Sequence, residues 1–406
     1  MRFLGVAALR RSAVTALLAA AGLSALAGSS SAADWPQWRG PARSGISSES
    51  AWTSRFPRSG PRRVWSAQLG EGYSNVAVRG ERLYTMGNRG GKDTVFCLNT
   101  RNGKVVWSQS YPCPPGDYTG PRITPTLDGA VVYTLSRQGQ LFCFNAASGK
   151  VLWGKDLRAL TGAKEPTWGY SGSPLVYGNL LILNVGATGA AVDKRSGKVV
   201  WKSGPGPAGY SSPMPFTLGG KRGIVLFSAT EVVAVDPAKG RPLWRYPWRT
   251  QYDVNAADPI VSGDTVFISS NYNHGGALLR VAGSRVTPVW QNRNMRNFFG
   301  TCLLIGGYLY GNDDNTVRCL DLRSGTERWQ LRGVGKGGLI AAAGKLLILT
   351  ERGELVIATA KPDRYTELAR AKVLDGTNWN HPTLANGFVY CRNHEGLLVC
   401  LDLRGK

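Results

Sequence analysis

Eight dipeptides align as equivalent positions of an internal repeat, 37 to 49 residues apart: Asn75-Val76, Thr124-Pro125, Ser173-Pro174, Ser212-Pro213, Asp258-Pro259, Thr301-Cys302, Gly338-Leu339 and His381-Pro382. The residues three places before the second member of each dipeptide have the side chains best suited to binding. In chain order these positions hold Tyr73, Arg122, Ser171, Tyr210, Ala256, Phe299, Lys336 and Trp379. A cation pairs with carboxylates and an aromatic ring stacks on a flat molecule, so the set suits a flat anionic ligand. Asn380 and His381 follow Trp379 directly and could add hydrogen bonds. The alternative is that these positions only fill space or contact another protein.

Other chemistries find little support in residue spacing. His274, His381 and His394 lie in different repeats or loops without the HxxxH spacing of a zinc site. Residues 169–173 lack the final glycine of a nucleophile elbow. Residues 311–315 could offer oxygen atoms to calcium, but they are more simply a polar hairpin loop. The sequence therefore predicts no catalytic residue and no metal ligand.

The elements that must position these side chains come from an internal repeat. Its unit is Asn or Asp, three residues, Gly, three residues and Trp, and it occurs at 99–107, 145–153, 193–201, 236–244 and 321–329. Trp290 ends a degenerate copy and Trp65 precedes the first one. The Asx side chain caps a turn and Gly takes its positive φ, so each unit predicts a hairpin between two short strands. We expect these tryptophans to pack rather than to bind a ligand, because buried aromatic residues are mostly core.

Two more strand-like runs precede each hairpin, for example at 130–134 and 140–144. Four strands per unit of about 44 residues, with no helical periodicity, is the pattern of a propeller blade. The chain ends after a third strand at 398–403, and its folded part begins with an orphan fourth strand at 63–68. Pairing the two closes the ring and removes an exposed sheet edge. The sequence thus predicts an all-β, eight-bladed propeller of four-stranded antiparallel blades over 61–406; a β-solenoid is the alternative.

Seven cysteines leave disulfide pairing open. Cys97, Cys143, Cys319 and Cys400 occupy one repeated context, which favours small buried core residues. A two-residue turn at 395–396 would place Cys391 opposite Cys400, close enough for a disulfide. Two free thiols are the alternative for this pair.

These features resemble the quinoprotein-type propellers, the family with pyrroloquinoline-quinone (PQQ) repeats. The resemblance rests on Gly-Lys-Val-Val-Trp at 103–107 and 197–201, Cys-Leu-Asp at 319–321 and 400–402, and Trp-Pro-Gln-Trp-Arg-Gly at 35–40. It implies that each outer-strand tryptophan docks between neighbouring blades. The fold is shared by quinoprotein alcohol dehydrogenases and by the lipoprotein subunit of the β-barrel assembly machine, so it leaves the function open.

The resemblance implies PQQ, a flat tricarboxylate, as a possible cofactor. Its binding residues would be Arg122, Lys336, Trp379, Tyr73, Tyr210, Asn380 and His381. The dehydrogenases also carry adjacent cysteines, a calcium held by Glu, Asn and Asp, and an Asp base. This sequence has no Cys-Cys pair, and no acid here matches the spacing of those ligands.

The first 33 residues read as a signal peptide, with a basic start, an apolar run at 12–27 and small residues before the expected cleavage point. The apolar run is too short to span a bilayer comfortably, so an uncleaved anchor is the weaker alternative. A leader segment at 34–60 then precedes the propeller. We therefore expect an exported, periplasmic or extracellular monomer without a transmembrane segment in its mature chain.

The formal net charge is +23. In an exported protein such a charge favours an anionic envelope surface over nucleic acid. We expect a non-catalytic binding or scaffolding platform in the bacterial cell envelope, whose partner is an envelope protein or an anionic envelope surface. A minimal PQQ-dependent dehydrogenase acting on an alcohol or sugar is the alternative. A third possibility, the assembly-machine lipoprotein, is opposed by the missing lipid-attachment cysteine near the cleavage point.

Overall fold

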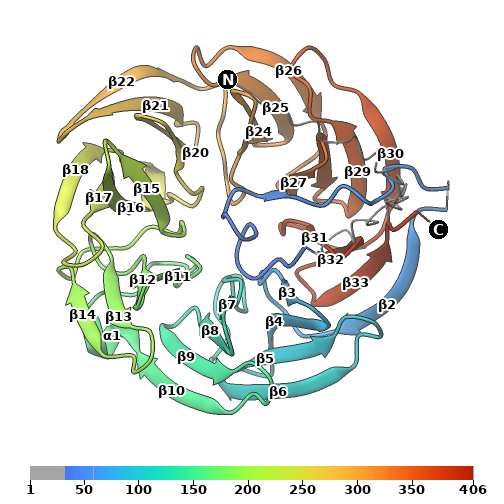
Figure 1. Cartoon of the computed structure of the whole chain (residues 1–406), viewed down its shortest axis with the longest axis horizontal. Helices are drawn as coiled ribbons and strands as arrows, with labels where there is room; N and C mark the ends of the chain where they lie inside the picture. Colours follow the sequence, from blue (N-terminus) through green and yellow to red (C-terminus); the bar gives the residue numbers. More distant parts are fainter. Residues whose placement is uncertain (1–32, 58, 406) are drawn as a thin grey trace, which may run out of the picture. The chain divides into compact units, whose positions relative to one another are not determined.

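Eight antiparallel sheets are arranged as blades around a central axis (Figure 1). The computed structural model describes residues 33–57 and 59–405, so the predicted signal peptide lies outside the described residues except for Ala33. Within the described ranges, one short helix, α1 (Leu157–Thr161), and one 3-10 turn, η1 (Gln251–Asp253), interrupt the strands. The predicted all-β class and the eight blades are confirmed.

Each blade runs from an inner strand beside the axis to an outer strand at the rim, in chain order. Blade 1 is β3 (Ala77–Arg79), β4 (Arg82–Arg89), β5 (Lys92–Asn99) and β6 (Val105–Pro112); blade 2 is β7 (Thr126–Asp128), β8 (Val131–Leu135), β9 (Gln140–Asn145) and β10 (Val151–Asp156). Blade 3 is β11 (Leu175–Tyr177), β12 (Leu180–Leu183), β13 (Ala190–Asp193) and β14 (Val199–Lys202); blade 4 is β15 (Met214–Leu218), β16 (Lys221–Phe227), β17 (Glu231–Val235) and β18 (Pro242–Pro247).

The second half of the ring repeats this order. Blade 5 is β19 (Ile260–Ser262), β20 (Thr265–Ser270), β21 (Gly275–Ala282) and β22 (Arg285–Asn292); blade 6 is β23 (Leu303–Ile305), β24 (Tyr308–Asp313), β25 (Thr316–Asp321) and β26 (Glu327–Arg332). Blade 7 is β27 (Gly338–Ala342), β28 (Lys345–Leu349), β29 (Glu354–Thr359) and β30 (Glu367–Lys372); blade 8 is β31 (Thr383–Ala385), β32 (Phe388–Arg392), β33 (Leu397–Asp402) and β2 (Arg62–Gln68).

The ring closes as predicted. Strand β2, which comes first in the chain, pairs antiparallel with β33 as the outer strand of blade 8, and Gln68 lies opposite Leu397. The last blade therefore has four strands although the chain supplies only three of them at its C-terminal end. Strand β2 thereby covers the edge of β33 that would otherwise be unpaired.

The repeated tryptophans join neighbouring blades. The ring of Trp201 in blade 3 lies against the turn glycine Gly240 of blade 4, where an added Cβ would approach the indole to 2.4 Å. Its Nε1 donates to the carbonyl of Pro237 at 2.8 Å. Gly103, Gly149, Gly197 and Gly325 make the same close approach to Trp65, Trp107, Trp153 and Trp290. The Asx-Gly-Trp repeat is thus an interblade contact, and glycine is required where the indole packs.

The cysteine register differs from the prediction. All seven cysteines are free, and Tyr390 rather than Cys391 lies opposite Cys400. The predicted two-residue turn at 395–396 does not form, because Asn393 closes a longer loop. The Asn393 amide donates to the Leu397 carbonyl, and Asn393 Oδ1 accepts from the Leu397 amide. A one-residue slip sends neighbouring side chains to opposite faces of a sheet. The two thiols therefore cannot pair.

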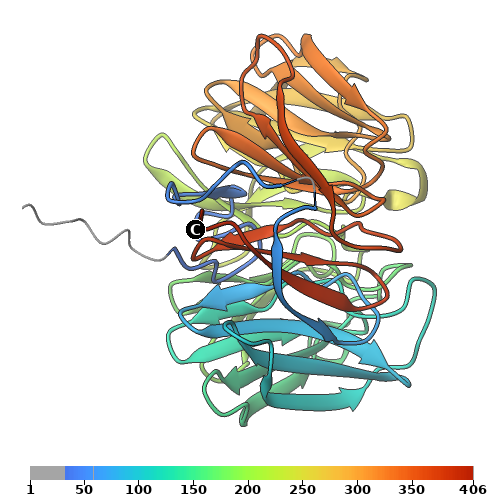
Figure 2. The same cartoon turned by 90° about the vertical axis from the view of Figure 1, so that its right-hand side faces the viewer.

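The leader is part of the fold of the ring. In Figure 1 its blue trace crosses the middle of the ring. Trp35 makes an isolated bridge with Val78 of β3, and β1 (Ile46–Ser47) adds a parallel fifth strand to the inner edge of blade 7. Figure 2 shows the disc from its edge, with the leader and the C-terminus on the same side. Among the described residues, none of the helices has the length and apolarity needed to cross a bilayer.

Candidate functional site

A cavity of about 190 Å³ lies on the axis where the inner strands begin. Its walls come from the segments that enter each blade, because every inner strand starts at this end of the ring. The eight repeat-equivalent positions all line it: Tyr73, Arg122, Ser171, Tyr210, Ala256, Phe299, Lys336 and Trp379. Asn380 and His381 line it as well. The structure therefore brings together all seven residues predicted for cofactor binding, while their ligand role stays a prediction.

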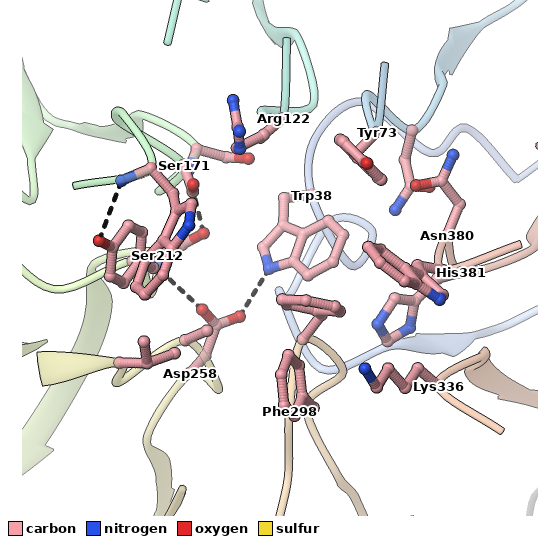
Figure 3. A pocket seen from close by; sticks show the side chains of 18 of the residues that line it. Trp38, Tyr73, Arg122, Ser171, Ser212, Asp258, Phe298, Lys336, Asn380 and His381 are labelled. Atoms are coloured by element: carbon pink, nitrogen blue, oxygen red, sulfur yellow. Dashed lines mark hydrogen bonds between the residues drawn. The ribbon is translucent and has the colours of Figure 1, made fainter. Parts of the chain in front are cut away.

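The floor of the cavity is Trp38, which comes from the leader. Figure 3 shows its indole in the centre of the site, between Tyr73, Asp258 and Phe298. Trp38 Nε1 donates to Asp258 Oδ2 at 2.6 Å, and the amide of Ser212 donates to Asp258 Oδ1 at 2.7 Å (Figure 3). A buried carboxylate needs such donors to replace its lost hydration. Asp258 is thus engaged at both oxygens.

Two arginines of the leader lock this floor in place. Arg39 and Arg43 are only 4% and 2% exposed. Arg39 donates to the carbonyls of Thr301 and Cys302 in blade 6, at 2.9 and 2.7 Å, and its Nε lies 4.0 Å from Asp258. Arg43 donates to the carbonyls of Ser173 and Pro174 in blade 3, at 2.9 and 3.0 Å. The leader therefore ties blades on different sides of the ring to one another through the axis.

Burial lowers the pKa of both leader arginines, that of Arg43 to about 10. Arg43 has carbonyl partners but no carboxylate within ion-pair distance among the described residues. Arg392 of β32 is buried against blade 1; burial lowers its pKa to about 10, and among the described residues it donates only to Thr85 Oγ1 and to backbone carbonyls. Buried charge without a counter-ion creates a strong local field. The cavity therefore sits beside an excess of positive charge.

The two predicted cations differ in availability. The Arg122 guanidinium donates to the carbonyls of Gly120, Asp117 and Tyr118, so it holds its own loop together. Burial, with help from Arg137, lowers the Arg122 pKa to about 10. The Lys336 ammonium instead stands over the ring of Phe298 at 4.4 Å and over that of Trp379 at 5.3 Å. Lys336 is therefore the cation that an incoming anion would meet.

The predicted aromatic residues already contact one another. Trp379 stacks on Tyr73 with ring centroids 5.6 Å apart and 14° between the planes, and Phe299 lies 5.0 Å away. Trp379 Nε1 donates to Glu351 Oε1 at 2.7 Å. Burial raises the pKa of Tyr73 to about 12, and burial also raises that of Tyr210. Both phenols therefore stay protonated at neutral pH and act as neutral hydrogen-bonding groups.

His381 is buried, and burial lowers its pKa to about 3. Its Nδ1 lies 3.0 Å from the Leu339 carbonyl, which makes Nδ1 the protonated nitrogen of a neutral ring. Nε2 is buried without a partner among the described residues. His381 therefore offers one unused acceptor at the cavity wall. The neighbouring Asn380 donates to the Arg392 carbonyl at 3.4 Å, a weak contact that leaves it largely available.

Sequence reasoning missed several lining residues. Trp38 lies outside the repeat, and its motif at 35–40 had served only as a family resemblance. Asp258 stands in one of the eight dipeptides, and the same alignment predicts its place near this face; its bond to Trp38 was not predicted. Two tyrosines of the lining adopt positive φ, Tyr118 at 57° and Tyr272 at 53°, and so does Tyr252 at 64°, which packs against Tyr272. Strained non-glycine residues gather at functional sites, but φ cannot be read from a sequence.

The lining residues fit one part of the expected quinone chemistry. Lys336 and the unpartnered His381 Nε2 suit a flat molecule with carboxylates and a hydrogen-bond donor. The cavity lining contains a single carboxylate, Asp258, and both of its oxygens are occupied by donors. A calcium site needs several free oxygen ligands. The described residues therefore fit a flat anion but do not fit the calcium and base of the dehydrogenases.

This fold and axial cavity define a PQQ-like β-propeller. The family model described as outer membrane protein assembly factor BamB matches residues 114–331, more than half of the chain. The chain belongs to that family.

Individual relatives agree with this assignment at low identity. Tetrathionate hydrolase of Acidithiobacillus ferrooxidans is 24% identical over 231 residues, which cover 52% of this chain and 44% of that protein. The chain thus spans less than half the length of that curated relative. The structure of BamB from Moraxella catarrhalis is similar with a TM-score of 0.62 and 15% identity, covering 84% of this chain and all of that one.

Quinohemoprotein alcohol dehydrogenase from Comamonas testosteroni is also similar, with a TM-score of 0.68 and 14% identity over 92% of this chain and 81% of that one. Likenesses at such identities show the fold alone.

Proposed function

We propose that this protein is a non-catalytic binding platform of the bacterial cell envelope, which holds a small flat anion in the axial cavity. The observation that carries the proposal is the state of Asp258, whose two oxygens are held by Trp38 and the Ser212 amide. A general base needs an oxygen free to reach the substrate's proton. The cavity combines this occupied carboxylate with one available ammonium, on Lys336. Such a lining suits binding of an anion better than catalysis by proton transfer.

The envelope location rests on two supports. The first 33 residues have the pattern of a signal peptide. The family description names outer membrane protein assembly, which takes place in the envelope. A platform in this compartment would meet its ligand or partner without the cytoplasmic nucleic acids that a +23 chain would otherwise attract.

The test compares binding with turnover. Purified protein is titrated calorimetrically with PQQ and with simpler flat aromatic carboxylates, with and without Ca²⁺, and dye reduction is followed with alcohols and sugars. We expect binding of flat carboxylates that does not require Ca²⁺, and no substrate-dependent dye reduction. Calcium-dependent dye reduction would instead establish the alternative, a minimal PQQ-dependent dehydrogenase. If no flat carboxylate binds, the proposal that the axial cavity holds a flat anion is wrong.

A further inference from the structure

The face opposite the cavity carries a repeated pattern of lysine and exposed aliphatic residues. Because each inner strand begins at the cavity and successive strands alternate in direction, the turn between the third and fourth strand of every blade lies on the opposite face. In blades 1, 2 and 3 the residue after the turn glycine is Lys104, Lys150 or Lys198. Two aliphatic residues follow each lysine. We call residues 104–106, 150–152 and 198–200 the lysine-aliphatic arc.

The arc is exposed and its lysines are unpaired. Val105, Leu152 and Val200 are 53%, 49% and 48% exposed, which is high for aliphatic side chains of strands. The ion pairs of the neighbouring turns join Arg101 to Glu81 and Lys194 to Asp128, and no carboxylate among the described residues pairs with the three lysines. In blades 4 to 8 the corresponding segments do not combine a cation with two aliphatic residues. The pattern is therefore confined to three consecutive blades.

The turns present the arc rigidly and at one level. In blade 2, Asn145 Oδ1 accepts from the amides of Ala147 and Ser148; in blade 3, Asp193 Oδ1 accepts from the amide of Ser196. The turn glycines of blades 2 and 3 pack against Trp107 and Trp153 of the preceding blades. Repeat-equivalent turns held in the same way lie at equal height on the ring, so the three lysines can contact one plane together.

We propose that the lysine-aliphatic arc docks this protein on an anionic phospholipid bilayer. Ammonium groups attract anionic headgroups, and adjacent aliphatic side chains enter the boundary between headgroups and acyl chains. The arc follows the rim of the face opposite the cavity, so a flat partner can touch three blades at once, whereas a groove for an acidic peptide would require a concave surface. Docking by this face leaves the axial cavity on the opposite face directed away from the bilayer.

The test measures binding of the full protein to vesicles of phosphatidylcholine with 30% phosphatidylglycerol by co-sedimentation. The variant is K104E/K150E/K198E. The matched control, K92E/K164E/R249E, changes the net charge equally at exposed residues near the cavity face. At low ionic strength we expect about a hundredfold weaker binding for the arc variant and a change below threefold for the control. Pure phosphatidylcholine vesicles should bind the wild type only weakly.

The outcomes separate this proposal from diffuse charge and from a protein partner. Equal loss in the arc variant and the control would overturn it, because the total charge would then decide binding. Binding of polyglutamate with the same affinity as vesicles, and with the same loss in the arc variant, would assign the surface to an acidic protein instead. The apolar contribution is checked with V105S/L152S/V200S, which should reduce vesicle binding that survives in high salt. Unchanged circular dichroism and melting temperature establish that each variant is folded.

Discussion

Trp38 and Asp258 are 220 residues apart in the chain and meet on the axis of the ring, where the indole Nε1 donates to the carboxylate at 2.6 Å. Arg39, the next residue of the leader, approaches the same carboxylate to 4.0 Å. One side chain of blade 5 thereby holds part of a segment that makes no blade of its own. The leader is consequently a structural part of the cavity.

Replacing Asp258 with Asn should test this attachment. The substitution keeps the shape but removes the charge that faces Arg39 and weakens the bond from Trp38, and hydrogen bonds to charged groups contribute about 1.5–3 kcal/mol each. We expect Asp258→Asn to lower the free energy of unfolding by about 2–3 kcal/mol in urea denaturation. Asp253→Asn is the control, since Asp253 is exposed near the same face and should change stability by less than about 0.5 kcal/mol. Equal stability of both variants would mean that the leader is not held by Asp258.

The tryptophans between blades allow a matched comparison. Trp201 donates to the Pro237 carbonyl, whereas Nε1 of Trp244 is buried without a partner among the described residues, because blade 5 carries the degenerate copy of the turn. Both rings are buried. Trp201→Phe should therefore destabilise the protein by about 1 kcal/mol more than Trp244→Phe, the value of one hydrogen bond beyond the shared loss of ring area. Urea denaturation measures both; equal losses would show that the indole bond contributes nothing to blade docking.

The same turns explain how much of the fold could be predicted from the sequence. The Asx-Gly-Trp spacing predicts the blade number, since five of the tryptophans pack against a turn glycine of the next blade, and the complementary ends predict the pairing of β2 with β33. The eight dipeptides predict the cavity lining for the same reason: equivalent positions of a ring face the same axis.

What could not be predicted depends on contacts outside the repeat. The position of Trp38 depends on a bond to Asp258, and the sequence around it carries no periodic signal that would place it on the axis. The Cys391 register depends on one Asn393 side chain closing a loop. Arg122 and Lys336 are both cations at equivalent positions, yet only the folded loop shows that Arg122 is bound to its own carbonyl groups.

His381 should make stability fall in acid. Its pKa is lowered to about 3 in the folded protein, chiefly by burial, and the ordinary value is 6.5. The unfolded chain therefore binds a proton below pH 6.5 that the folded chain refuses until about pH 3, so this residue costs stability as the pH falls through that window. The slope is about 1.4 kcal/mol per pH unit. His381→Gln removes the titration, so the wild-type free energy of unfolding should drop more steeply than that of the variant between pH 6.5 and 4.5. If the two free-energy curves run parallel, the folded protein binds a proton at His381 as readily as the unfolded chain does, and the prediction is wrong.

The last prediction separates the two cations of the cavity. Among the described residues the Lys336 ammonium lies over the rings of Phe298 and Trp379 and pairs with no carboxylate, so it is available to an anion, whereas Arg122 is bound to the carbonyl groups of its loop. Lys336→Ala should therefore weaken binding of a flat aromatic carboxylate by about tenfold to a hundredfold, the equivalent of one charge-assisted bond, without changing the melting temperature.

Arg122→Ala should show the opposite pattern, because the Gly120, Asp117 and Tyr118 carbonyls lose their donor and the loop loses its support. We expect a lower melting temperature, and weaker binding that partly recovers on cooling as the loop orders. Lys336→Arg is the control and should keep most of the affinity, since it keeps the charge. Calorimetric titration and thermal melts of the three variants measure both properties. If Lys336→Ala binds the carboxylate as tightly as the wild type while Arg122→Ala does not, the anion is held by Arg122, and the assignment of Lys336 as the available cation is wrong.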